Sequence, residues 1–181
     1  MKKIQELTGR VLHWSQARAF QCLHELRDGD EVVATLTWRG SFNPTGLFTS
    51  ADGRWEFRQG GFWGMRTLVF AEGSSTEVAT LHRSVWHPGG RLEVQGAQVL
   101  QARTNFTMTR LEFQDMSGRP VARCDRFRGM FRKSADLRLA PEAANLMELP
   151  WLAGLIWHVA LRLQQEAGGA AAGAAAAAAA G

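Results

Sequence analysis

Residues 150–163 read PWLAGLIWHVALRL, an apolar segment close to the C-terminus. As a helix it would be about 21 Å long at 1.5 Å per residue, shorter than the roughly 30 Å of a bilayer core. Pro150 suits the first turn of such a helix. His158 and Arg162, four residues apart, form a narrow polar seam, and apolar side chains cover the other directions. A helix that is apolar nearly all round has to be enclosed, so we expect a buried helix over about 150–165.

The sequence before this segment alternates apolar and polar residues in short runs, the pattern of half-buried β-strands. Turn signals separate the runs, at Asp28-Gly29, Asp52-Gly53, Glu72-Gly73, Pro88-Gly89-Gly90 and Ser117-Gly118. The expected strands occupy residues 19–27, 32–39, 46–50, 54–58, 62–70, 77–83, 91–94, 99–103, 106–113, 121–128 and 135–139.

A faint internal repeat spans three of the expected hairpins. Each hairpin places a short apolar run and a turn before a Val-Ala pair, at Val33-Ala34, Val78-Ala79 and Val121-Ala122, with spacings of 45 and 43 residues. About four strands per repeat give about twelve in total. We therefore predict a mainly β fold, a closed antiparallel barrel of about twelve strands. Its lumen is too wide for strand side chains alone to fill, and it encloses the hydrophobic C-terminal helix.

Length and composition allow one sizeable core, because the chain has 181 residues and 45% hydrophobic content. We expect a single domain over residues 1–166, followed by a low-complexity Ala/Gly tail, 167–181, that is disordered or a frayed helix. The stretch 1–14 lacks the apolar core of a signal peptide, so we expect a cytoplasmic protein. Cys22 and Cys124 are expected to be core thiols.

The segments Val33–Trp38, Asp52–Phe57 and Gly61–Trp63, followed by a final apolar helix, resemble the tubby C-terminal-like superfamily. This superfamily groups tubby domains, LURP-one-related proteins and phospholipid scramblases, and the resemblance covers about residues 10–165. It implies a twelve-stranded barrel around a central hydrophobic helix. The resemblance carries over no catalytic motif, and neither the phosphoinositide-binding residues of tubby nor the calcium-binding segment of scramblases has a position-by-position match here.

Basic residues are concentrated between Arg119 and Arg138, where seven basic and two acidic side chains give +5, against +4 for the whole chain. Within this stretch, 126–133 interleaves charges with Phe127 and Phe131. Guanidinium groups there suit phosphate headgroups, while the rings suit acyl chains. The candidate lipid- or anion-binding residues are Arg123, Arg126, Arg128, Arg132 and Lys133. An ordinary solvated hairpin with snorkelling arginines is the alternative. Nucleic acid is not expected, because no matching motif accompanies the charge.

Two further groups of side chains are candidates for a site. Cys22 and His24 lie two apart on one expected strand face, but two ligands are too few for a metal. His82 and His87, beside a Pro-Gly turn, would need a carboxylate partner for acid-base work. We therefore predict no metal, no cofactor and no catalytic residue.

The polar seam of the expected helix has two interpretations. In the first, His158 makes a hydrogen bond inside or near the barrel mouth, and Arg162 caps the helix end. In the second, the two side chains anchor a ligand that enters beside the helix.

The sequence thus favours a non-enzymatic barrel module that associates with anionic phospholipid at a membrane surface, as a peripheral cytoplasmic protein. Two alternatives stay open. One is a scaffold whose barrel binds a protein partner and no ligand, and the other is an enzyme that acts on a lipid or small molecule. The sequence identifies no particular protein partner.

Overall fold

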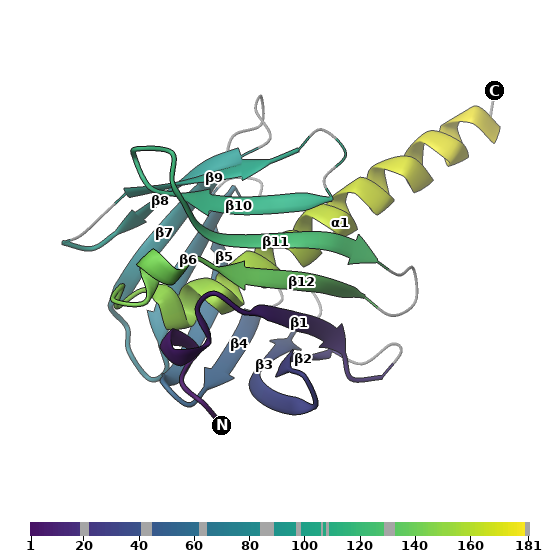
Figure 1. Cartoon of the computed structure of the whole chain (residues 1–181). Helices are drawn as coiled ribbons and strands as arrows, with labels where there is room; N and C mark the ends of the chain where they lie inside the picture. Colours follow the sequence, from purple (N-terminus) through teal and green to yellow (C-terminus); the bar gives the residue numbers. More distant parts are fainter. Residues whose placement is uncertain are drawn as a thin grey trace.

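The computed structural model describes residues 1–18, 22–40, 45–61, 65–83, 89–96, 99–105, 107, 109–128 and 133–179, and its account of side chains ends at Glu166. Most of these residues belong to strands, and one long helix follows them (Figure 1).

Twelve strands form a closed antiparallel barrel. Each strand pairs with the next along the chain, and β1 pairs with both β2 and β12, which closes the ring. The strands are β1 (Val11–Gln16), β2 (Leu23–Asp28), β3 (Glu31–Arg39), β4 (Thr45–Ser50), β5 (Gly53–Gly60), β6 (Arg66–Ala71), β7 (Glu77–Arg83), β8 (Gly89–Val94), β9 (Val99–Thr104), β10 (Arg110–Gln114), β11 (Pro120–Arg128) and β12 (Ser134–Leu139). The predicted fold class is confirmed. Short 3-10 turns, η1 (Ile4–Leu7) and η3 (Pro141–Ala143), flank the strands.

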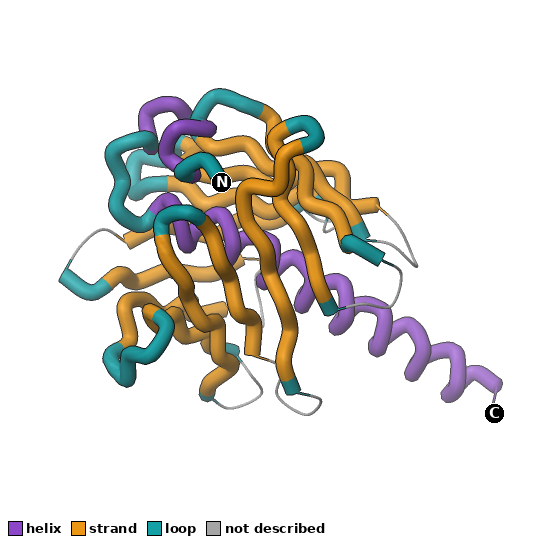
Figure 2. Tube along the Cα trace, turned by 90° about the horizontal axis from the view of Figure 1, so that it is seen from below, coloured by secondary structure: helices purple, strands orange, loops and turns teal. Residues whose placement is uncertain are grey.

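Helix α1 (Leu149–Ala179) runs through the barrel. Its first part is surrounded by strands, and its C-terminal part projects beyond them (Figure 2). Every residue over 149–161 is buried, so the prediction of an enclosed helix is confirmed. The helix does not end near residue 165, since it continues to Ala179 through the tail that we expected to be disordered or a frayed helix. Alanine has the highest helix propensity of all residues.

Aromatic rings fill the space between the helix and the strands. Trp157 stacks on Trp14 of β1 with ring centroids 5.8 Å apart. Phe48 of β4 lies against Gly154, where a Cβ would come within 2.5 Å of its ring. The missing side chain at Gly154 therefore lets the helix approach the barrel wall closely.

Three β-bulges explain the sequence repeat. The register of β2–β3 shifts by one residue, so that Val33 has no partner on the neighbouring strand. The same shift leaves Val78 of β7 without a partner on β6 and Val121 of β11 without a partner on β10. A paired, buried alanine follows each valine. A bulge bends a strand and increases its twist. The Val-Ala pair thus marks the place, recurring every four strands, where the barrel wall bends.

The strand pattern was wrong in three places. It missed β1, since the outward-facing Val11 is apolar and 53% exposed, which obscures the alternation with the buried Leu12 and Trp14. Strand β10 begins at Arg110 instead of 106, after a polar turn. Strand β8 begins at Gly89, inside the expected turn. Glycine is required at 89 and 90, because a Cβ at either position would clash with a neighbouring carbonyl oxygen. The expected starts at residues 19 and 62 lie outside the described residues.

The expectation of two core thiols is half right. Cys124 is buried, and burial raises the pKa of its thiol well above the usual value. Cys22 is exposed. It comes just before β2, whose first residue pair with β3 is Leu23 with Thr37. Cys22 therefore lies at the end of the strand and outside the barrel core.

Candidate anion-binding site

Four arginines from three adjacent strands line a pocket on the outer face of the barrel. The pocket has a volume of about 370 Å³ and is lined by Asn105, Thr109, Arg110, Arg123, Asp125, Arg126 and Arg138. Strand β10 supplies Arg110, β11 supplies Arg123 and Arg126, and β12 supplies Arg138. We call this feature the arginine pocket.

Strand register sets the charge pattern of the pocket. Arg123 of β11 lies directly opposite Arg138 of β12, and Asp125 lies directly opposite Asp136. Like charges directly opposite each other destabilise a strand pair. The side chain of Arg138 is exposed, and it forms no ion pair within the described part of the chain. Among the described residues, Arg138 is thus the arginine of this pocket without an acidic partner, and a bound anion would neutralise its charge.

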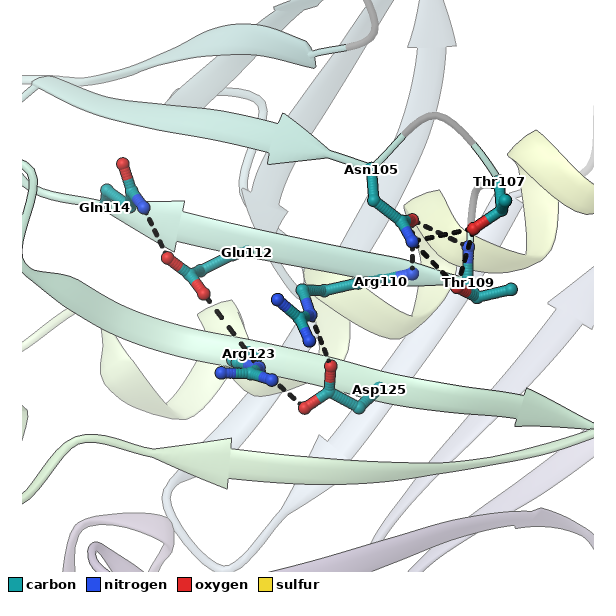
Figure 3. Close-up of polar contacts among 8 residues, drawn as sticks. All are labelled: Asn105, Thr107, Thr109, Arg110, Glu112, Gln114, Arg123 and Asp125. Atoms are coloured by element: carbon teal, nitrogen blue, oxygen red, sulfur yellow. Dashed lines mark hydrogen bonds and ion pairs between the residues drawn. The ribbon is translucent and has the colours of Figure 1, made fainter.

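Carboxylates hold most of the guanidinium groups in position. Asp125 accepts a hydrogen bond from Nε of Arg110 at 2.8 Å and forms an ion pair with Nε of Arg123 at 2.6 Å (Figure 3). Asp136 accepts a hydrogen bond from Nη1 of Arg126 at 3.3 Å. The carboxylate side chains are 13% and 17% exposed, whereas those of Arg110 and Arg126 are 49% and 62% exposed. The guanidinium groups of Arg110 and Arg126 are therefore more exposed to solvent than the carboxylates that hold them.

A polar turn fixes the start of β10 beside the pocket. The side-chain oxygen of Asn105 accepts hydrogen bonds from the backbone N–H groups of Thr109 and Arg110, both at 2.9 Å. Its amide nitrogen donates to the hydroxyl groups of Thr107 and Thr109, both at 2.8 Å (Figure 3). Asn105 thus closes the turn and places Arg110 at the pocket rim.

Further along β10, Glu112 extends the same network. Gln114 donates a hydrogen bond to its carboxylate, and Nε of Arg123 lies 4.0 Å from it (Figure 3). Arg123 therefore lies between Glu112 and Asp125, two acidic side chains from neighbouring strands.

A fourth bulge turns Arg126 outward and Phe127 inward. Asp125 pairs with Asp136 and Arg128 with Ser134, which leaves Arg126 and Phe127 opposite a single residue of β12. Arg126 has a φ of 57°, a left-handed conformation that costs a non-glycine residue about 1–2 kcal/mol. The ring of Phe127 packs against the core, 6.2 Å from Trp157. The expectation that this ring faces acyl chains is wrong.

The other candidate residues do not gather at the pocket. Arg128 is exposed at the end of β11, and Arg132 lies outside the described residues, as does Phe131. Lys133 is half-buried beside β1, where its backbone N–H donates to the side chain of Gln16, and burial lowers the pKa of its ammonium group. The charge of Lys133 acts on His24, whose pKa it lowers, and not on the arginine pocket.

Cys22 and His24 lie in different environments. His24 is buried with its ring 5.6 Å from that of Trp157, while Cys22 is exposed. Burial, and then the charge of Lys133, lowers the pKa of His24 to about 4. In the described ranges no group of three or more His, Cys, Asp or Glu side chains is placed to hold a metal ion.

His158 lies inside the barrel. Its ring stacks on Trp38 with centroids 4.7 Å apart, and its Nε2 lies 3.3 Å from Nε2 of Gln59, so the predicted hydrogen bond is present. Burial, followed by the charges of Arg162 and Arg83, lowers its pKa to about 3. Arg162 does not cap the helix end, because α1 continues past it.

His82 has a carboxylate neighbour on the outer face. Its Nε2 lies 3.6 Å from Glu93 of β8, and Glu93 also pairs with Arg91 at 3.2 Å. The His82 and Glu93 side chains are 38% and 49% exposed, so the pair is open to solvent. His87 lies outside the described residues.

Two of the four arginines that line the pocket, Arg110 and Arg138, are not among the predicted site residues, and neither are Asn105, Thr109 and Asp125. Arg110 precedes the basic stretch, and only the antiparallel return of β11 brings it beside Asp125. Arg138 was counted in the charge excess, but the register that sets it against Arg123 is not evident from spacing. The signal that could have found both is the position of each arginine on the outward face of its strand.

Comparison with family models, with curated proteins and with solved structures finds no match to this chain. Within the described part of the chain, no helix combines the length and the apolar character that a membrane span requires.

Proposed function

We propose that this protein is a non-enzymatic β-barrel module that binds anionic phospholipid headgroups through the arginine pocket. The observation that carries the proposal is the pairing of Arg123 with Arg138 across β11–β12. A phosphate between these two side chains would relieve their repulsion and accept charge-assisted hydrogen bonds from both guanidinium groups. Arg110 and Arg126 line the same pocket and would add to the attraction.

Because the lumen of the barrel is filled, the binding site is expected on the outer surface. A barrel of this size has room for a ligand, but the buried helix residues 149–161 and the rings around them occupy the lumen. Preorganisation also favours the arginine pocket, because Asp125 and Asp136 already restrain three of its four arginines. Restraint before binding reduces the entropy lost when an anion binds.

The architecture supports a relationship that we also propose, namely membership of the tubby C-terminal-like superfamily. A closed twelve-stranded barrel around a hydrophobic C-terminal helix is the fold that this resemblance implies. In this proposal the protein associates peripherally with the cytoplasmic surface of a membrane, where anionic lipids attract clustered arginines.

Vesicle co-sedimentation tests the proposal. The full chain is mixed with phosphatidylcholine vesicles, with and without a fraction of phosphatidylglycerol, at low and moderate salt. We expect binding to the anionic vesicles, weaker at the higher salt because ions screen exposed charges, and little binding to the neutral ones. Equal binding to both vesicle types would refute the headgroup site.

A further inference from the structure

A second pocket adjoins the arginine pocket and differs from it in chemistry. It has a volume of about 360 Å³, and Arg123 and Arg138 border both pockets. The apolar side chains that reach its surface are those of Pro120, Ala140 and Pro141, while Val121, Ala122 and Leu139 line it from the barrel core and Arg10 and Glu142 add charge. The aliphatic stems of the two shared arginines add apolar surface. A cationic site and an apolar site thus meet at Arg123 and Arg138.

A third pocket adjoins the apolar pocket. It has a volume of about 600 Å³ and shares Pro120, Val121 and Glu142 with the apolar pocket. Two exposed methionines, Met116 and Met147, follow its lining residues Asp115 and Leu146 in sequence and are 66% and 84% exposed. Exposed methionines are adaptable apolar contacts. The lining of the third pocket itself is mixed, because Asp115, Arg119 and Glu142 are charged.

The three pockets follow one strand. From Arg126 to Pro120, β11 rises about 3.3 Å per residue, which gives a track of roughly 20 Å. The valine of the third repeat bulge, Val121, lies at the point where the second and third pockets meet. We call this continuous feature the β11 groove.

The closed barrel limits what can occupy the β11 groove. An extended peptide needs main-chain hydrogen bonds along its length, usually from an unpaired strand edge. Strands β10, β11 and β12 are paired on both sides, so the groove offers side chains and no such edge. A hydrocarbon chain needs no hydrogen bonds along its length, and an anionic group at one end would complement the arginines.

We propose that the β11 groove binds a single-chain anionic amphiphile, with its phosphate or carboxylate in the arginine pocket and its alkyl chain along the apolar pocket. The inference rests on the proposed anion site and names the class of ligand that this site takes. Burial of the alkyl chain adds affinity in proportion to the apolar area removed from water. The groove therefore discriminates an alkyl phosphate from a small phosphate.

Isothermal titration calorimetry with methyl phosphate, octyl phosphate below its micelle concentration and 1-octanol tests this inference on the full chain. We expect octyl phosphate to bind at least tenfold more tightly than either of the other two. Ala140→Trp fills the apolar pocket and is expected to remove the advantage of the octyl chain while methyl phosphate still binds. Ser75→Trp, on an exposed turn remote from β11, is the matched control and should keep that advantage.

The outcomes separate the two proposals. Equal affinity for methyl and octyl phosphate would overturn the alkyl site and leave the anion site standing. Loss of the octyl advantage in Ser75→Trp, or its full retention in folded Ala140→Trp, would also overturn the alkyl site. If neither phosphate binds the wild-type protein, both proposals are wrong. Should Ala140→Trp fail to fold, the wild-type comparison of the three compounds still decides.

Discussion

Substitution of Arg138 is expected to raise the stability of the fold and to weaken anion binding. It faces Arg123 directly across β11–β12, with no ion pair to a described residue. Arg138→Gln removes this repulsion and should raise the free energy of unfolding by up to about 1 kcal/mol, as measured by chemical denaturation. Inorganic phosphate should raise the melting temperature of the wild type more than that of the variant.

The control for this substitution is Arg54→Gln on β5. Arg54 forms an exposed ion pair with Glu72 at 3.3 Å, and such pairs contribute between zero and about 1 kcal/mol. We expect this variant to be unchanged or slightly less stable, with the same response to phosphate as the wild type. A marked loss of stability in Arg138→Gln would show that the guanidinium group makes favourable contacts and would contradict the account of the pair.

Single residues show how far the sequence predicts the site. Arg123 and Arg126 were identified because the charge excess is local, and both line the arginine pocket. Lys133 belongs to the same stretch, yet it lies beside His24 because the bulge and the end of β11 change the direction of the chain. Charge counts locate a segment. They do not give side-chain direction, which depends on register and bulges.

At the scale of elements, the contact between α1 and β4 gives a test of the enclosed helix. A Cβ on Gly154 would lie 2.5 Å from the ring of Phe48, and Trp55 and Phe57 pack around that ring. Gly154→Ala should therefore lower the free energy of unfolding by about 1–3 kcal/mol through overpacking, although alanine favours a helix.

Urea denaturation measures this change, with Gln165→Ala as the control. Gln165 is exposed on the same helix, so we expect its substitution to stay within about 0.5 kcal/mol. Gly154→Arg should unfold the domain, because an unpaired buried charge costs several kcal/mol. A Gly154→Ala protein as stable as the wild type would contradict the close contact with Phe48.

Elements were predicted best where the sequence repeats. The Val-Ala pairs predicted three equivalent hairpins, and in the structure they are β2–β3, β6–β7 and β10–β11. The reason for the repeat, a bulge at each valine, could not be read from the sequence, because a bulge is defined by the register of two strands. Strand β1 was missed for a related reason, since the apolar Val11 lies on the outer face.

At the scale of the whole molecule, buried histidines make stability depend on pH. The pKa values of His24 and His158 are lowered to about 4 and about 3, against an unfolded value near 6.5. As pH falls below about 6.5, the unfolded chain takes up protons that the folded protein excludes, so stability falls. This loss ends near the folded pKa values.

Denaturation at pH 7, 6 and 5 tests this dependence. Each histidine should lower the free energy of unfolding by about 2 kcal/mol between pH 7 and pH 5. His24→Leu should show about half of the wild-type loss, because its buried ring would no longer titrate. Constant stability of the wild type across this range would contradict the assignment of both histidines as buried and neutral.

The fold of the whole molecule was easier to predict than its site. The apolar helix is too short to cross a bilayer, so it has to be enclosed by the protein itself. About twelve strands can do this by closing into a barrel around the helix. The site depends instead on which outward-facing residues become neighbours across strands, as Arg123 and Arg138 do. These contacts are set by register, and a shift of one residue would send every such side chain to the other face.

The measurement that tests the central claim most directly compares two variants of equal net charge. Arg123→Gln/Arg138→Gln alters the arginine pocket, whereas Arg54→Gln/Arg58→Gln alters β5, which lies six strands from β11 and five from β12 around the barrel. In co-sedimentation with anionic vesicles, we expect the first variant to lose at least tenfold in affinity and the second to bind like the wild type. Equal affinities of the two variants would show that binding follows net charge and not the arginine pocket, and would contradict the account.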